Sequence, residues 1–260
     1  MIRATVIASG SMGNAVLVSS STTSVLVDAG TSAKTIESSL QFLGTNPSDL
    51  AGVLVTHEHG DHTRALKTLC RKYRIPVFAN ALTADSLKRS GMSAQWCIFL
   101  TNCAFSLGDL TVTAFPVPHD AADPVGFVIN HGESSFAVAT DLGYVSRQII
   151  SNLSGVGALL LESNHDRSML EADPKRPPSV KARILSRHGH LSNEAAAELV
   201  AAITSPTLRH VVLAHLSEDC NSRALALKVM AERLKALGNH FTQVHCPDGS
   251  QDGFPFSLEI

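Results

Sequence analysis

Residues 56–62 read Thr-His-Glu-His-Gly-Asp-His. This stretch follows the apolar run Gly-Val-Leu-Val at 52–55, which predicts a buried strand that runs into a polar loop. His57 and His59 are two residues apart, so in extended backbone both imidazoles point to the same side of the chain. The stretch therefore presents two ligating side chains to one metal ion.

The residues after His59 extend this predicted site. Gly60 permits a sharp turn, and Asp61 and His62 then start a helix from which they can address a second ion. Imidazole and carboxylate together suit Zn²⁺, with Mn²⁺ and Fe²⁺ as alternatives. A solvated polar loop is the other interpretation, but three histidines and one aspartate so close together at a strand end favour a metal site.

The composition restricts the class of protein. The chain has 260 residues, a hydrophobic share of 44% and a formal net charge of −2, which excludes intrinsic disorder and a strongly basic tail. No apolar run reaches the ~18 residues of a membrane helix, and the N-terminal residues lack the pattern of a signal peptide. Five irregularly spaced cysteines without a Cys-x-x-Cys pair indicate a reducing compartment, so we expect a cytoplasmic protein.

Short β runs and helical segments alternate along the chain, which predicts sheet layers covered by helices. The predicted helices are 31–43, 61–74, 180–187, 193–203 and 222–237, the last one capped by Asn221 and Gly238. The predicted strands are 4–10, 14–20, 24–30, 52–59, 76–80, 110–117, 125–130, 134–141, 158–164, 210–217, 241–246 and 254–260.

The motif at 56–62 resembles the HxHxDH signature of the metallo-β-lactamase superfamily. Four further motifs follow the order of that family, at predicted strand ends: VLVDAG with Asp28, PVPHD with His119, AVATD with Asp141 and VVLAHLS with His215. The resemblance spans nearly the whole chain. It implies an α/β fold, a four-layer αββα sandwich, in a single domain over residues 1–260.

The resemblance also implies a site for two divalent ions, Zn²⁺ before Mn²⁺ or Fe²⁺. The implied ligands are His57, His59 and His119 for one ion, Asp61, His62 and His215 for the other, and Asp141 as a bridge. Asp28 is implied to support the ligands from behind. Two such ions share a hydroxide and lower its pKa, and Asp61 is placed to hold or accept a proton of that hydroxide.

Three features of the sequence indicate which branch of the superfamily it resembles. β-Lactamases usually carry a cysteine where Asp141 stands, and flavodiiron proteins carry a glutamate where His59 stands. The segments SGSMGN at 9–14, ESNHD at 162–166, GHLSN at 189–193 and AHLSEDCN at 214–221 are similar to the YycJ/WalJ-like branch. That branch implies a nuclease that uses a metal-bound hydroxide, most simply a 5′–3′ exonuclease acting on DNA in preference to RNA.

Segments around Glu162 and His190 also resemble ribonuclease Z-like enzymes. This implies that Glu162 orients His190, which contacts the scissile phosphate or protonates the leaving oxygen. The alternative is purely structural, with Glu162 in a salt bridge at a strand end and His190 near a helix start.

Two basic stretches without acidic residues, 64–74 and 175–187, can contact phosphates. The candidate substrate-binding residues are Arg183, Arg187, Asn193 and Ser217. Two alternative functions stay open: a small-molecule phosphodiesterase or thioester hydrolase of the same fold, and a non-catalytic nucleic-acid-binding or signalling protein. No membrane partner is expected. The oligomeric state is left open, with a homodimer as one alternative.

Overall fold

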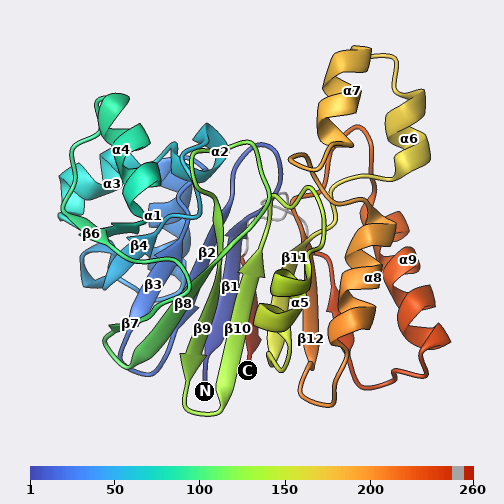
Figure 1. The fold of residues 1–260 in the computed structure, drawn as a ribbon. Coiled ribbons are helices and arrows are strands. Elements are labelled where there is room, and N and C mark those ends of the chain that lie inside the picture. Colours follow the sequence, from blue (N-terminus) through green and yellow to red (C-terminus); the bar gives the residue numbers. More distant parts are fainter. Residues whose placement is uncertain (248–254) are drawn as a thin grey trace.

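The computed structural model describes residues 1–247 and 255–260. Two seven-stranded sheets pack face to face (Figure 1). In spatial order, the first sheet contains β14 (Phe256–Glu259), β1 (Arg3–Ala8), β2 (Ala15–Ser19), β3 (Ser24–Val27), β4 (Gly52–Leu54), β5 (Val77–Ala79) and β6 (Trp96–Ile98). The second contains β13 (Gln243–His245), β12 (His210–Ala214), β11 (Ala158–Glu162), β10 (Ser134–Ala139), β9 (Val125–His131), β8 (Leu110–Pro116) and β7 (Ala104–Leu107).

Helices cover the outer faces of both sheets (Figure 1). The first sheet is covered by α1 (Ala33–Phe42), α3 (Leu66–Tyr73) and α4 (Ala81–Arg89), and the second by α5 (Arg147–Leu153), α8 (Asn193–Ile203) and α9 (Arg223–Ala236). The short α2 (Gly60–Thr63) and η1 (Pro47–Asp49) lie in connections, and α6 (Arg167–Ala172) and α7 (Pro178–Ile184) form an arm that projects beyond one end of the second sheet. The predicted αββα sandwich is confirmed.

The alternation of side chains along each strand sorts the apolar residues into three buried layers. In β10, Phe136 and Val138 face the layer between the sheets, whereas Ala137 and Ala139 face the helices. One core therefore lies between the sheets, and one lies between each sheet and its helices. Strands buried on both faces appear in sequence as nearly continuous apolar runs, which is why they could be recognised.

The predicted single helix over 61–74 was wrong, because the structure has two helices there, α2 and α3. The backbone N–H of Ala65 donates to the carbonyl of Ala29 at 2.8 Å and not to that of Asp61, four residues earlier. The Asp61 carbonyl instead accepts from the N–H of Asn14, also at 2.8 Å. Contacts with two segments remote in sequence thus separate α2 from α3. They leave Asp61 and His62 on a short helix of their own.

Other boundaries differ in smaller ways. The strands predicted at 24–30, 52–59, 134–141, 158–164 and 210–217 end earlier, because their last residues form the loops of the site. Helices α4, α5 and α6 and strands β6 and β7 were not predicted. Ser222, not Asn221, is the N-cap of α9, since its side chain accepts from the N–H of Leu225. Phe254, in the predicted last strand, lies outside the described residues.

The longest described helix, α9, has 14 residues. In residues 1–247 and 255–260, no helix is long and apolar enough to cross a membrane. The two ends of the chain meet in the first sheet, where β1 pairs antiparallel with β14 and Arg3 lies opposite Glu259.

Candidate metal centre

Seven polar side chains from five separate segments meet at one edge of the sandwich. They follow β4, β8, β10 and β12 or lie in α2, and they are His57, His59, Asp61, His62, His119, Asp141 and His215. Within each of three overlapping groups, one ligand atom per residue lies within 4.8 Å of the others. The structure thus brings together the whole predicted ligand set.

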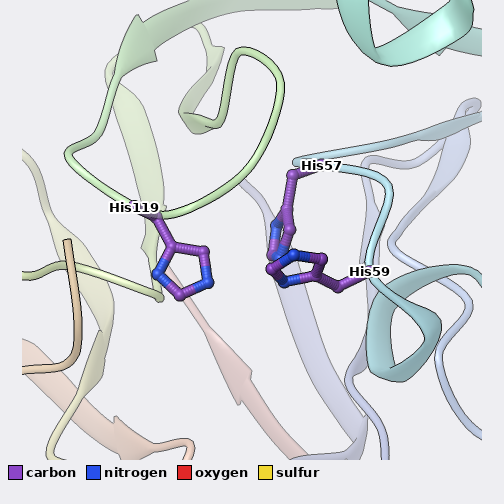
Figure 2. Close-up of side chains that lie close together, drawn as sticks. All are labelled: His57, His59 and His119. Atoms are coloured by element: carbon purple, nitrogen blue, oxygen red, sulfur yellow. The ribbon is translucent and has the colours of Figure 1, made fainter. Parts of the chain in front are cut away.

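The first group consists of His57, His59 and His119, whose rings point toward one another (Figure 2). The ring centroids of His57 and His59 are 4.6 Å apart, and those of His59 and His119 are 5.2 Å apart. Within residues 1–247 and 255–260, Nε2 of the buried His57 has no hydrogen-bond partner. Nδ1 of His119 donates to the carbonyl of Gly189 at 3.2 Å, which leaves its Nε2 as a lone-pair donor.

Burial lowers the pKa of both His57 and His119. For both rings, the effect of burial is larger than that of the nearby Asp141 carboxylate, which would raise the pKa. Neutral imidazoles with an available nitrogen are the form in which histidine binds a divalent metal. The first group therefore offers three nitrogen donors, a set that suits Zn²⁺.

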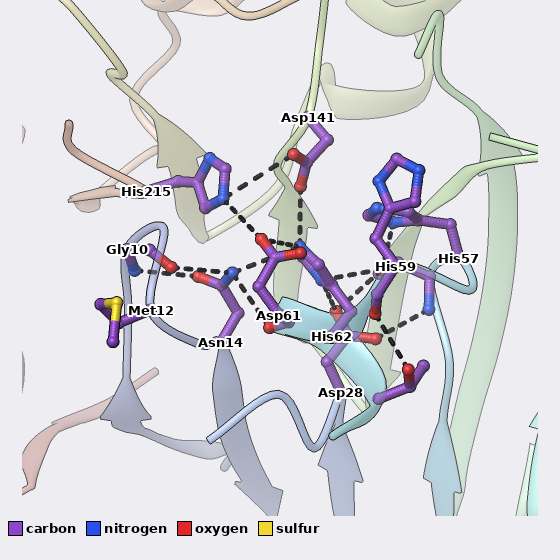
Figure 3. A network of polar contacts seen from close by, with 12 residues as sticks. Gly10, Met12, Asn14, Asp28, His57, His59, Asp61, His62, Asp141 and His215 are labelled. Atoms are coloured by element: carbon purple, nitrogen blue, oxygen red, sulfur yellow. Dashed lines mark hydrogen bonds and ion pairs between the residues drawn. The ribbon is translucent and has the colours of Figure 1, made fainter. Parts of the chain in front are cut away.

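The second group consists of Asp61, His62 and His215 (Figure 3). Oδ2 of Asp61 lies 3.4 Å from Nε2 of His62 and 3.4 Å from Nε2 of His215. Burial would raise the pKa of Asp61, but hydrogen bonds with the two imidazoles outweigh it and lower the pKa. The carboxylate is thus ionised and available to a cation.

Asp28 supports His62 from the side opposite to the other ligands. Its Oδ2 lies 2.8 Å from Nδ1 of His62, so Nε2 of that ring faces the centre. Asp28 also accepts from the backbone N–H and the hydroxyl of Thr56, at 2.9 and 2.8 Å. Its side chain is therefore held on three sides and fixes the orientation of one ligand.

Asp141 lies between the two groups. Its carboxylate oxygens are 3.1 Å from Nε2 of His62, 3.6 Å from Nε2 of His119 and 3.7 Å from Nε2 of His215. Burial would raise its pKa, but His215 and His62 lower it further than burial raises it. In the part of the chain that the structure describes, Oδ2 of Asp141 has no partner with hydrogen-bond geometry. A buried, ionised carboxylate in this position has the chemistry of a bridging ligand.

Three site residues adopt left-handed backbone conformations. Asp28, Asp141 and His215 have φ values of 60°, 59° and 56°, and among described residues only two other non-glycine residues have positive φ. Such conformations cost on the order of 1–3 kcal/mol each and concentrate at functional sites. Each of the three residues follows a strand closely, so the backbone turns sharply and directs the side chain into the centre.

Glu162 and His190 lie directly beside the ligands. Glu162 is fully buried, and its Oε1 lies 2.7 Å from Nδ1 of His190 and 2.9 Å from Nδ1 of His215. Its Oε2 accepts from the N–H groups of Leu142 and Leu191, at 2.9 and 3.1 Å. One carboxylate therefore orients a ligand and a second imidazole, and it also pins the two backbone segments that carry Asp141 and His190.

The charges of Glu162, His190 and His215 shift one another's pKa. Burial would raise the pKa of Glu162, but His190 and His215 lower it to about 2. Burial would lower the pKa of His190, but Glu162 raises it. For His215, burial is outweighed by Asp141, Asp61 and Glu162, which raise the pKa to about 10.

The predicted substrate-binding residues divide into two pairs. Arg183 and Arg187 are exposed; Arg183 pairs with Asp120, and the guanidinium of Arg187 lies 4.4 Å from the ring centroid of Tyr144. Asn193 and Ser217 are buried. The expectation that these two contact substrate does not fit their placement.

The contacts of Asn193 and Ser217 explain their burial. Asn193 accepts from the hydroxyl of Ser163 at 2.6 Å and contacts the side-chain amide of Asn221 at 2.9 Å. The Ser217 hydroxyl accepts from the N–H of Cys220 at 3.2 Å. Both side chains hold loops together behind the site.

Sequence reasoning missed Asp120, which follows His119 directly. Oδ1 of Asp120 lies 3.2 Å from Nε2 of His119, and its Oδ2 pairs with Arg183 of the α6–α7 arm. Its position next to a predicted ligand was the available signal. Asn14 was assigned no firm role, yet its Nδ2 lies 3.2 Å from Nε2 of His62.

Gly30 packs against the backbone of the metal motif. A Cβ at Gly30 would lie 1.5 Å from the carbonyl oxygen of Asp61, whereas a Cβ at Gly60 would meet nothing within 4 Å. We expect Gly30→Ala to lower the free energy of unfolding by about 1–3 kcal/mol, because the motif must shift. The matched change Gly60→Ala should alter it by less than about 0.5 kcal/mol. Chemical denaturation measures both, and equal stabilities would contradict this packing.

Comparison with known proteins adds an independent observation. Residues 23–216 match the model of the Beta-lactamase superfamily domain. The chain is 39% identical to exodeoxyribonuclease YycJ of Bacillus anthracis, covering 90% of this chain and 89% of that protein. It is 36% identical to exodeoxyribonuclease WalJ of Streptococcus pneumoniae serotype 2, strain D39, covering 88% and 87%.

A solved structure shows the same fold. The crystal structure of Zn²⁺-bound PqqB from Methylobacterium extorquens has a TM-score of 0.72 to this chain, with 18% identity and coverage of 99% of this chain and 100% of that one. The predicted family is thereby confirmed, and a divalent-metal site agrees with the donors present. The chain belongs to the metallo-β-lactamase superfamily, in the branch that contains YycJ and WalJ.

Proposed function

We propose that this protein is a dinuclear-metal-dependent 5′–3′ exonuclease that acts on DNA. The observation that carries the proposal is the position of Asp141 between two groups of three donors each. The broader class, a metal-dependent hydrolase of phosphodiester bonds, is confirmed by the family and by its exodeoxyribonuclease relatives. The number and identity of the ions, the polarity and the preference for DNA are the proposed part.

The donor set fits divalent ions, with Zn²⁺ as our first choice. His57, His59 and His119 would hold one ion, Asp61, His62 and His215 the other, and Asp141 both. When bound, the ions supply an activated water and neutralise phosphate charge. Asp61 has a side chain that is 26% exposed, so it is accessible from the open side of the centre. With Oδ2 turned to His62 and His215, its Oδ1 can accept a proton from the attacking water.

His190 is suited to act as the general acid. Its Nδ1 faces Glu162 at 2.7 Å, so Nε2 is the nitrogen that can donate a proton to the leaving oxygen. The negative charge of Glu162 raises the pKa of His190, which favours the protonated ring that a general acid requires. The ring centroid of His190 lies 5.2 Å from that of His119 and 5.4 Å from that of His215, at the border of both metal groups.

Phosphate contacts would come from Arg183 and Arg187. Both are exposed; Arg183 lies in the last turn of α7, where it pairs with Asp120, and Arg187 lies on the segment that leads from α7 to His190. Guanidinium groups bind phosphate oxygens without reading the base sequence, as an exonuclease requires. The names of the two exodeoxyribonuclease relatives support DNA over RNA as the partner.

We also propose that residues 1–260 form a single domain in a cytoplasmic protein. The pairing of β1 with β14 supports the single domain, because it ties the first and last strands into one sheet. Five cysteines without a disulfide support a reducing compartment. One cooperative unfolding transition, seen by two spectroscopic probes, would test the single domain.

Cleavage of end-labelled nucleic acids tests the proposed function. Single- and double-stranded DNA and RNA, labelled at the 5′ or the 3′ end, are incubated with Zn²⁺, Mn²⁺ or Fe²⁺, beside an Asp61→Ala control. We expect mononucleotides to appear from the 5′ end of DNA, and no cleavage by the control. Turnover of cyclic nucleotides or thioesters without any cleavage of nucleic acid would replace this proposal with the small-molecule alternative.

A further inference from the structure

One exposed aromatic side chain lies at the edge of the sandwich that carries the metal centre. Among the described residues, the aromatic side chains that are markedly exposed are Phe42, Tyr144 and Phe241. Phe42 ends α1, which starts at the metal edge and leads about 15 Å away from it. Phe241 precedes β13, which is parallel to β12, so it lies at the opposite edge. Tyr144 alone belongs to the metal edge.

The backbone that carries Tyr144 is tightly held. Tyr144 follows Asp141 by three residues, which span at most about 11 Å. The N–H of Leu142 donates to Glu162 at 2.9 Å, and the N–H of Gly143 donates to the carbonyl of Pro118 at 2.8 Å. The ring therefore projects from a fixed loop near the bridging carboxylate.

Arg187 completes a composite surface. Its guanidinium lies 4.4 Å from the centroid of the Tyr144 ring, a cation–π distance. The two backbones also touch, since a Cβ at Gly143 would lie 2.2 Å from the carbonyl oxygen of Arg187. Arg187 precedes His190 by three residues, so the pair lies on the side where His190 would protonate the leaving oxygen.

Most other cations of the 175–187 stretch are already paired with acids. Lys175 contacts Asp219, Arg176 contacts both Asp173 and Asp219, and Arg183 contacts Asp120. Arg187 has an aromatic partner and, among the described residues, no ion pair, so its charge is available to an incoming anion. A cation beside an aromatic face, next to a phosphodiester-cleaving centre, has the chemistry of a nucleotide subsite.

We propose that Tyr144 and Arg187 form a subsite for the nucleotide on the leaving-group side, with its base stacked on the pair and its phosphate at the Arg187 guanidinium. This inference rests on the proposed function and adds a preference for phosphodiesters that carry a base. Stacking tolerates every base, because each base has a π face, so the subsite recognises nucleic acid without sequence specificity.

The test combines a protein variant with a substrate variant. The kcat/KM of the metal-loaded native protein, Tyr144→Ala and Tyr144→Phe is measured on an intact DNA oligonucleotide. The same measurement uses an oligonucleotide with one abasic residue at the leaving nucleotide. On intact DNA, we expect Tyr144→Ala to lose about 5- to 150-fold and Tyr144→Phe to stay within about threefold of the native protein. On abasic DNA, the native protein and Tyr144→Ala should be equal, because the stacking partner is already missing.

The outcomes separate this inference from the proposed function. Unchanged cleavage of intact DNA by Tyr144→Ala would overturn the subsite. An equal fold loss on intact and abasic DNA would also overturn it, because the tyrosine would then act only through the loop. Metal content and thermal unfolding of Tyr144→Ala distinguish that second case from misfolding. A native protein that cleaves neither oligonucleotide with any of the three metals would instead contradict the nuclease proposal.

Discussion

Asp61→Ala is expected to lower kcat for DNA cleavage by about 10²- to 10⁴-fold while the fold persists. Oδ2 of Asp61 lies 3.4 Å from Nε2 of both His62 and His215, and Asp61 is the proposed ligand whose carboxylate would take a proton from the attacking water. Its side chain is partly exposed, so the substitution leaves no large buried cavity. Steady-state rates on labelled DNA, with unfolding followed by circular dichroism, measure both parts of the prediction.

Asp85→Ala is the matched control. Asp85 lies on the exposed face of α4 and pairs only with Lys88, at 3.2 Å. The same chemical change there should leave kcat within about twofold of the native value, because surface pairs contribute little. His59→Ala should lower kcat at least as strongly as Asp61→Ala, because it removes a donor of the first group. Full activity in Asp61→Ala or His59→Ala would refute the site.

His190→Ala should slow turnover by about 10²- to 10⁴-fold and weaken metal binding much less. Nδ1 of His190 lies 2.7 Å from Oε1 of Glu162, and neither of the two proposed groups of three donors includes His190. Metal affinity, measured by competition with a chromogenic chelator, is therefore expected to stay close to that of the native protein. Unchanged turnover would show that His190 is only structural.

The pH dependence of turnover distinguishes a His190 that donates a proton from one that is only structural. An acid must carry its proton, so activity is lost as the pH rises through the pKa of His190. Because Glu162 raises that pKa, the alkaline limit should lie at a higher pH than it would for an imidazole without this carboxylate. Glu162→Gln removes the charge, so the limit should move to lower pH. In His190→Ala this limit should disappear from the rate profile.

The proposed ligands could be located from sequence because each lies in a short motif at a strand end. The strands themselves were visible as apolar runs, and the helix at 193–203 has the predicted bounds. Local pattern and motif order were sufficient, since the fold places the ends of these strands at one edge. His119 and His215, alone in their segments, became assignable only through that order.

Long-range contacts explain what could not be predicted. The break between α2 and α3 depends on Ala29 and Asn14, which lie far from it in sequence. Asn193 begins a helix close to His190 in the sequence, which suggested that it binds substrate. Its side chain instead forms hydrogen bonds with Ser163 and Asn221. The 175–187 stretch contains no acid, but acids from elsewhere in the chain pair with most of its cations. These contacts join residues that are far apart in sequence, so no local sequence pattern could predict them.

Metal titration of the chelator-treated protein tests whether cleavage requires two divalent ions per chain. Zn²⁺ or Mn²⁺ is added in steps while bound metal and cleavage of 5′-labelled DNA are measured on the same samples. We predict no cleavage without metal, and activity that reaches its plateau at about two ions per chain, as expected for a two-metal site. Cleavage that persists in the presence of chelator, or full activity with one ion per chain, would contradict the account.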